Sequence, residues 1–243
     1  TMPTIMSRRE GWVNISQALE LVSRLAGLDS GVAHGLFIHS LGYVDAVSLR
    51  IAFYYSKRRN LILGLHLSEG VKELGELVKL LSLREGEGEN IVAVHCIERE
   101  DYKRYGIRVV HCPSSNLALY GRTIRDMNIF DALGSDWPLL LGSALNTYRM
   151  AVNVHGVKQA PVIIRKATAG GYKLYNVSWN GDFVAFDEAL NKVLAGEAVP
   201  KFVSVRNRLV LAEGRIIGLG LTRSDVDEII RDLRGEAFEK YSI

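Results

Sequence analysis

The sequence predicts an α/β protein in which parallel strands are buried beneath helices. Short apolar runs alternate along the chain with segments of helical period. The apolar runs, such as residues 61–67 and 91–96, are continuous rather than alternating, which is typical of strands buried on both faces. The composition, 48% hydrophobic and 23% charged, is typical of a globular protein. The length of 243 residues fits one large domain with a small addition.

Six strands are expected in the first part of the chain, with helices between them. The strands are predicted at residues 3–7, 35–39, 61–67, 91–96, 107–112 and 128–133, the last being the poorest. The helices are predicted at residues 15–26, 47–55, 71–83 and 99–105. Asn14 is a good N-cap for the first of these helices. This order of elements indicates repeated βα units and a parallel sheet.

After Asp136 the pattern changes. Helices are predicted at residues 143–154 and 159–172, followed by short strands within 182–186, 202–205 and 208–219, and by a helix at 223–234. Turn signals at Asn207-Arg208 and Glu213-Gly214 separate the strands. We therefore expect a barrel-like domain over residues 1–178 and a small β element with a final helix over residues 179–243.

Composition excludes several classes of protein. The net charge is only +3, and the one basic triplet, Lys57-Arg58-Arg59, is typical of a helix end, so nucleic acid is not an expected partner. No apolar run approaches the ~18 residues of a membrane helix, and no secretory signal is visible. The two cysteines form no CxxC pair, which favours a reducing cytoplasm. A homo-oligomer is a candidate assembly.

Histidines stand at the carboxyl ends of three of the predicted strands. His66, His95 and His111 each end an apolar run, and Asp136 ends a fourth. One such histidine is usually structural, but four polar residues at the carboxyl ends of parallel strands share the rim where barrels build their chemistry. Imidazole nitrogens with one carboxylate are the ligands that a divalent metal such as zinc prefers.

Glu69 and His95 are the expected catalytic groups at this rim. Glu69 lies three residues after His66 and could take a proton from a metal-activated water. The alternative is that Glu69 caps the following helix as an acid of its first turn. Strand alternation predicts that His95 points inward, to bind the metal or the reacting group, and that Cys96 points outward as an inert thiol.

Four segments carry a resemblance to a known family. They are LHLSE at 65–69, AVHC at 93–96, VVHCPSSN at 109–116 and LGSD at 133–136, of which the third is the most specific. In this order they resemble the amidohydrolase superfamily, in particular its deaminase and chlorohydrolase branch. The resemblance implies a TIM-like (β/α) barrel, incomplete at its amino-terminal side, with a small element from the family's β-sandwich.

The resemblance also implies roles for individual residues. His66 and Asp136 would be metal ligands, with Glu69, His95 and Asp136 catalytic. His111 and Asn116 would shape the substrate pocket, and Trp137 could stack on a flat ring. The implied reaction is hydrolysis of a C–N bond, most simply deamination of a purine, pyrimidine or related heterocycle. The implied cofactor is one divalent metal, zinc in the first place and iron as the alternative.

The sequence departs from the family in one respect. No His-x-His pair occurs in the chain, although that pair supplies two metal ligands in the family. The chain starts at what would be the third barrel strand, as in a shortened homologue or part of a longer protein. Two matched ligands fall short of the usual three, so we expect poor metal binding by this chain alone unless His95 is recruited. The alternative function is a non-catalytic binding or assembly protein.

Overall fold

The computed structural model describes residues 2–8, 11–26, 34–136, 141–177, 183–186, 188–197, 202–206, 209–212 and 215–219. The chain forms two compact units, Thr1–Val177 and Ser178–Ile243. In the described residues, no helix is both long and apolar enough to cross a membrane. Trp137 and the predicted helix at 223–234 lie outside the described residues.

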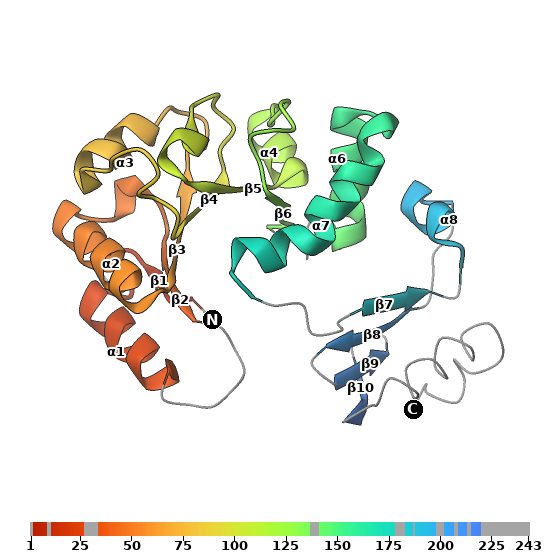
Figure 1. Cartoon of the computed structure of the whole chain (residues 1–243), viewed down its shortest axis with the longest axis horizontal. Helices are drawn as coiled ribbons and strands as arrows, with labels where there is room; N and C mark the ends of the chain where they lie inside the picture. The colour runs from red at the N-terminus through yellow and green to blue at the C-terminus, as the bar shows by residue number, and fades with distance from the viewer. Residues whose placement is uncertain are drawn as a thin grey trace. The chain divides into compact units, whose positions relative to one another are not determined.

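A six-stranded parallel sheet forms the centre of the first unit (Figure 1). Its strands follow one another in sequence order: β1 (Thr4–Ile5), β2 (Gly35–Ile38), β3 (Ile62–Leu67), β4 (Ile91–His95), β5 (Arg108–His111) and β6 (Ala132–Leu133). The predicted α/β class and the six strands are confirmed, and the poorest predicted strand is reduced to two residues. Within the described part of the chain, β1 and β6 each pair on one side only, so the barrel is not closed.

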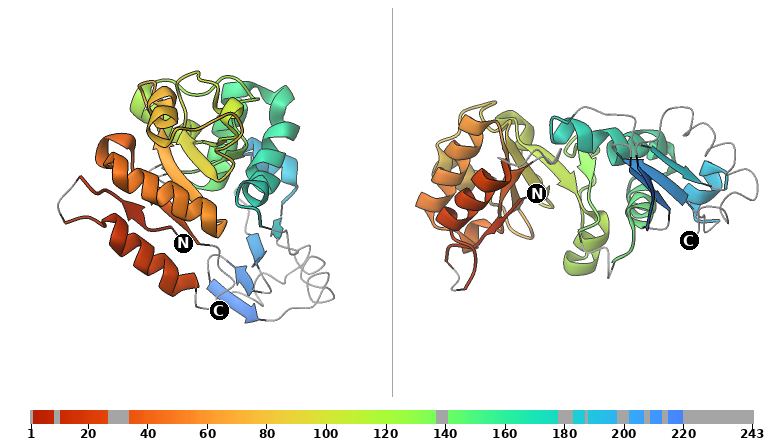
Figure 2. Two further views of the ribbon diagram at one scale, coloured as in Figure 1. Left: turned by 60° about the vertical axis from the view of Figure 1, so that its left-hand side comes forward. Right: turned by 90° about the horizontal axis from the view of Figure 1, so that it is seen from below.

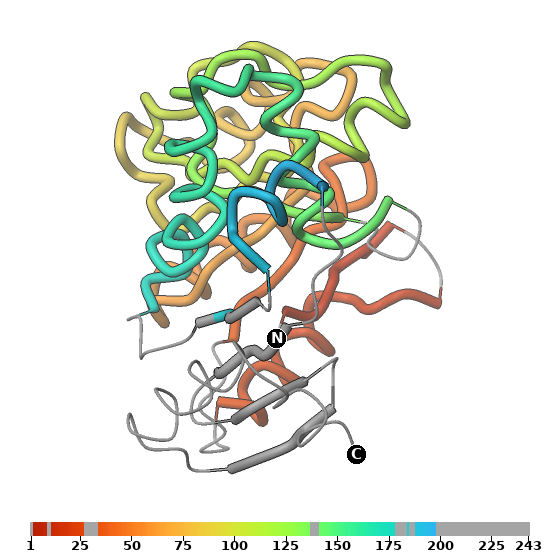
Figure 3. The backbone as a smooth tube through the Cα atoms, turned by 90° about the vertical axis from the view of Figure 1, so that its right-hand side faces the viewer, coloured from red at the N-terminus to blue at the C-terminus, as the bar shows by residue number. Residues whose placement is uncertain are grey.

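Helices follow the strands along the first unit (Figures 2 and 3). They are α1 (Ile15–Ala26), α2 (Ala46–Arg59), α3 (Leu74–Leu81), α4 (Pro113–Tyr120), α6 (Ala144–His155) and α7 (Ala160–Leu174), with 3-10 turns at Leu41–Tyr43, Tyr102–Tyr105 and Val157–Gln159. Asn14 caps α1 as predicted, because its side chain and that of Gln17 accept hydrogen bonds from each other's backbone N–H. The segment predicted as a helix at 99–105 contains only a 3-10 turn.

The two faces of the sheet bury different residues. Leu65, Ala93 and Val109 belong to the large core beneath the helices. Val92, Val110 and others on the opposite face form a smaller cluster with Leu174 of α7. Both clusters are apolar, which explains why the strand sequences are continuous runs rather than alternating ones.

The second unit contains a four-stranded antiparallel sheet in the order β10-β9-β8-β7. Its strands are β7 (Phe183–Phe186), β8 (Phe202–Arg206), β9 (Leu209–Ala212) and β10 (Arg215–Leu219). They match the segments predicted as short strands, except that β8 extends one residue beyond the predicted 202–205. A short helix, α8 (Leu190–Ala195), was not predicted from the sequence.

Candidate active site

Three strand ends bring His66, His95 and Asp136 together. β3 pairs with β4, β4 with β5 and β5 with β6, all in parallel, so their carboxyl ends share one edge. One ligand atom of each of the three residues lies within 4.8 Å of the others. The ring centroids of His66 and His95 are 5.0 Å apart. Two imidazoles and a carboxylate therefore converge on one point.

A local backbone turn places His95 in this group. His95 pairs in register with Leu67, whose side chain lies in the core beneath the helices, so a regular strand would point His95 there too. Instead, φ is +75° at His95 and +46° at Cys96. The ring of His95 lies beside His66 because of this left-handed turn, and not because of the strand alternation from which we predicted it.

Burial sets the electrostatics around His66. Burial and, next, the neighbouring His95 lower the pKa of His66, although Glu69 acts in the opposite direction. A lowered pKa keeps the imidazole neutral, with a lone pair available for a metal. The carboxylate Oε1 of Glu69 lies 3.6 Å from Nε2 of His95, and its side chain is 25% exposed against 2% for His95. Glu69 is therefore the group of this pair that solvent or a ligand reaches more easily.

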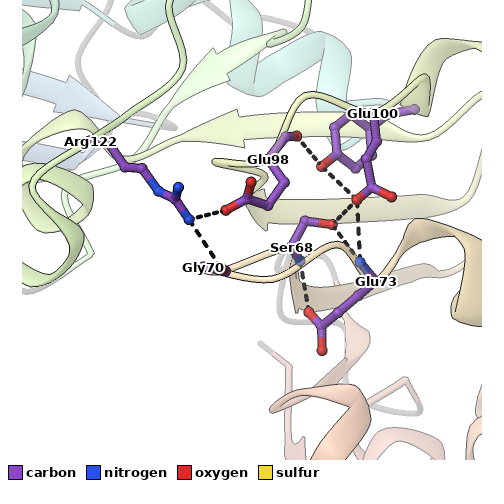
Figure 4. A network of polar contacts seen from close by, with 7 residues as sticks. Ser68, Gly70, Glu73, Glu98, Glu100 and Arg122 are labelled. Carbon is purple, nitrogen blue, oxygen red and sulfur yellow. Dashed lines mark hydrogen bonds and ion pairs between the residues drawn. The ribbon is translucent and has the colours of Figure 1, made fainter.

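Hydrogen bonds anchor the chain on both sides of Glu69 (Figure 4). Before it, Ser68 donates from its backbone N–H to Glu73 at 2.8 Å and from its hydroxyl to Glu100. After it, the guanidinium of Arg122 donates to the carbonyl of Gly70 at 3.1 Å and also pairs with Glu98. The position of the Glu69 backbone is thus fixed by the loops around it.

The cap of the following helix is Glu100, and not Glu69. The backbone N–H groups of Glu73 and Leu74 both donate to the Glu100 carboxylate, at 3.3 Å each. Helix α3 begins at Leu74, and the acid in its first turn is Glu76. The alternative role weighed for Glu69, as the acid of that first turn, does not match this arrangement.

The side chain of Asn116 contacts the ring of His95. Its Oδ1 is 2.8 Å from Nδ1 of His95, and its Nδ2 donates to the hydroxyl of Thr123 at 3.1 Å. Asn116 is 0% exposed and Thr123 is 6% exposed. The predicted pocket residue is thus fully buried, with both ends of its amide engaged by protein groups.

His111, also predicted to contact substrate, lies deep in the protein. It is 0% exposed, and its ring is 4.7 Å from that of Phe130 and 5.5 Å from that of His155. Burial, with smaller contributions from His155 and His95, lowers the pKa of His111 to about 3. His111 is consequently neutral at physiological pH and is not part of the His66, His95 and Asp136 group.

Two further residues, His39 and Tyr120, lie near the site. The ring of His39 lies 5.3 Å from that of His66. Its position directly after an apolar run was the available signal. Tyr120, at the end of α4, has its ring beside Gly70, and burial followed by the neighbouring Glu69 raises the pKa of Tyr120 to about 12. No sequence signal joins Tyr120 to Glu69, because the contact depends on how α4 packs.

The residues present fit a divalent metal. His66, His95 and Asp136 supply three donors, the number usual at a catalytic zinc. The neutral state favoured for His66 is the state that binds metal. His95 is the third donor that the sequence analysis considered as a recruited ligand.

Comparisons with known proteins match solved structures only; no protein-family model and no curated protein matches significantly. An adenosine deaminase from Xanthomonas campestris with bound zinc aligns with 96% of this chain and 64% of its own, at 17% identity and a TM-score of 0.67. A guanine deaminase from C. acetobutylicum with bound guanine aligns with 79% of this chain and 59% of its own, at 19% identity and a TM-score of 0.62. A mutant atrazine chlorohydrolase from Arthrobacter aurescens, with zinc and atraton, aligns with 96% of this chain and 64% of its own, at 12% identity and a TM-score of 0.57.

These similarities establish the fold. They confirm, at that level, the resemblance to amidohydrolase deaminases and chlorohydrolases that the four sequence segments indicate. The chain spans less than two thirds of the length of each of these solved chains.

Proposed function

We propose that this chain carries the site of a metal-dependent hydrolase that removes an amino group from a nitrogen heterocycle. The convergence of His66, His95 and Asp136 on one point, with Glu69 beside them, carries the proposal. The shared fold with a zinc-bound adenosine deaminase and a guanine deaminase supports both the metal and the class of substrate.

His66, His95 and Asp136 would hold the metal, with zinc favoured and iron as the alternative. When bound, a divalent metal lowers the pKa of water toward ~7 and so supplies a nucleophile at neutral pH. The neutral imidazole of His66 and the carboxylate of Asp136 offer nitrogen and oxygen donors suited to either ion. Three donors leave a coordination position for a non-protein ligand.

Glu69 is the residue proposed to move protons. Its carboxylate would accept a proton from the attacking water and deliver it to the leaving amino group, the role of a general base and then a general acid. Tyr120 lies near this carboxylate, which contributes, after burial, to the raised pKa of its phenol. Nε2 of His95 lies 3.6 Å from the Glu69 carboxylate, so the proton-moving group stands beside a proposed metal ligand.

Replacing Glu69 tests this function. The chain is supplied with Zn²⁺, and ammonia release is measured on a panel of purines, pyrimidines and triazines. Glu69→Gln is expected to keep the fold and the metal but to lower turnover by about 10²–10⁴-fold, the usual contribution of a general acid–base group. Glu76→Gln, at an exposed position of α3, is the matched control. Near-normal turnover of Glu69→Gln would remove this residue from the mechanism.

The second candidate function is a non-catalytic binding or assembly protein. The observation that favours it is the lack of any His-x-His pair in the chain. Metal content of the purified protein separates the two. About one equivalent per chain supports the hydrolase, whereas none, even after incubation with Zn²⁺, supports the binding protein.

A further inference from the structure

We propose that residues 113–123, which comprise helix α4 and the turn after it, position the two catalytic groups, and that Asn116 sets the tautomer of His95. This segment contains most of the sequence motif HCPSSN, whose asparagine was expected to contact substrate. The inference rests on the proposed function, because it concerns the same site. It assigns a positioning role, and not a catalytic one, to Asn116.

The contact between Asn116 and His95 restricts which ring nitrogen carries the proton. The amide Oδ1 has no proton to give, so Nδ1 of His95, 2.8 Å away, must donate. A neutral imidazole has a single N–H, and Nε2 therefore keeps its lone pair. Nε2 is also the nitrogen nearest to Glu69. The nitrogen that faces the site is thereby available to bind a metal or to accept a proton.

Buried neighbours hold the Asn116 amide in this orientation. Its Nδ2 donates to the hydroxyl oxygen of Thr123 at 3.1 Å. That hydroxyl lies 3.5 Å from Nδ1 of His111, which can accept its proton because burial keeps His111 neutral. If Thr123 donates to His111, it accepts from Asn116, and the amide oxygen is then directed at His95. Hydrogen bonds of this kind beyond the ligands are known to orient metal-binding histidines.

The same segment reaches the other catalytic group. The ring of Tyr120, the last residue of α4, lies against Gly70, the residue that follows Glu69. Two residues later, Arg122 donates to the carbonyl of Gly70, which follows Glu69 in the chain. One short element thus contacts His95 through Asn116, and it contacts Gly70, the residue after Glu69, through Tyr120 and Arg122. Its rigidity would fix the two groups relative to each other.

Burial argues against direct contact between Asn116 and a substrate. The side chain is 0% exposed, and its oxygen and nitrogen both have protein partners. A substrate contact would require breaking one of these bonds in the interior, which leaves a buried polar group without a partner. A positioning role explains the residue in the place where it lies.

Nitrogen-15 NMR of the histidine rings tests the proposal on the metal-free protein. In the unsubstituted chain, His95 is expected to carry its proton on Nδ1, with Nε2 unprotonated. Asn116→Leu removes the acceptor, and the two tautomers of His95 are then expected to mix. Ser115→Ala is the matched control, because this neighbouring buried side chain hydrogen-bonds the carbonyl of Cys112 and not His95. A proton on Nε2 in the unsubstituted chain would overturn the proposal.

Zinc titration gives the second readout. Asn116→Leu is expected to weaken Zn²⁺ binding by about 10–100-fold, the usual effect of losing such a supporting residue, and Ser115→Ala to leave it unchanged. If Asn116→Leu does not fold, Thr123→Val tests the same chain of bonds. Unchanged tautomer and affinity in the folded variants would refute the positioning role while leaving the hydrolase proposal intact. A locked tautomer in a chain that binds no zinc would support the positioning role and refute the proposed function.

Discussion

Left-handed backbone at single residues shapes the site. Ser68, His95 and Asp136 all have positive φ, at +54°, +75° and +58°, and each lies at or just beyond the end of a strand. Such conformations cost non-glycine residues on the order of 1–3 kcal/mol and persist only where the surroundings impose them. Here they turn His95 and Asp136 toward a common point. The strain at these strand ends is consistent with a functional site.

Gly134 is required by the packing next to Asp136. A Cβ at this position would lie 2.8 Å from Cγ1 of Val110 and 3.0 Å from Sγ of Cys112. We predict that Gly134→Ala lowers the free energy of unfolding by about 1–3 kcal/mol, the usual cost of overpacking, and weakens Zn²⁺ binding by displacing Asp136. Chemical denaturation and zinc titration measure the two effects.

Gly75→Ala is the control for this prediction. Gly75 lies in α3, and an added Cβ there meets no atom within 4 Å. Because alanine favours helix over glycine, this variant is expected to be unchanged or more stable by up to ~1 kcal/mol. Equal stability of the two variants would show that the contacts at Gly134 are not restrictive.

At the scale of elements, Asp45 connects the end of β1 to helix α2. Its carboxylate accepts hydrogen bonds from the backbone N–H groups of Val47 and Ser48 and from the hydroxyls of Ser48 and Ser7. These bonds, led by that from the Ser48 hydroxyl, hold the pKa of Asp45 well below its usual range. Asp45 thus caps α2 and ties it to the preceding strand.

We predict that Asp45→Ala lowers the free energy of unfolding by about 1–2 kcal/mol at pH 7, the usual cost of losing an N-cap. A carboxyl whose folded pKa is lowered stabilises above its unfolded pKa of ~3.9, and that contribution is lost as pH falls through the folded value. The difference from the unsubstituted chain should therefore shrink below about pH 4. Denaturation at several pH values measures it, and Asp45→Asn, which caps without charge, should lack this acid dependence.

The strands could be predicted from the sequence more fully than α4. Continuous apolar runs gave β3 and β4 to within a residue or two, because burial on both faces leaves a direct signature. Helix α4 was missed, since its buried residues, Pro113–Asn116, are largely polar and show no apolar stripe. Asn116 among them hydrogen-bonds to His95, a contact that no periodicity records.

On the scale of the molecule, sequence order predicted the order of strands but not every contact made at their ends. His66, His95 and Asp136 were predicted to share one rim because parallel strands end together, and the structure brings them there. His111 also ends its strand, yet its ring packs on Phe130 and His155 in the interior. The difference lies in local backbone turns and helix packing, which strand alternation does not describe.

Metal binding is predicted to stabilise one unit of the chain selectively. All three donors belong to the unit Thr1–Val177, and a ligand that binds only the folded state adds stability where its site is built. When the concentration of free Zn²⁺ is 100 times Kd, the free energy of unfolding rises by about 2.7 kcal/mol. For a unit of this size, that corresponds to a rise in Tm of roughly 5–11 °C.

Calorimetry measures this rise, and hydrogen exchange shows which unit gains protection. Protection is expected in peptides from the first unit and not in those from Ser178–Ile243. A chelator should reverse the rise, and Asp136→Asn should reduce it, because that variant replaces the only carboxylate of the donor set. Equal protection of both units, or a full rise in the variant, would place the stabilising zinc elsewhere than at His66, His95 and Asp136.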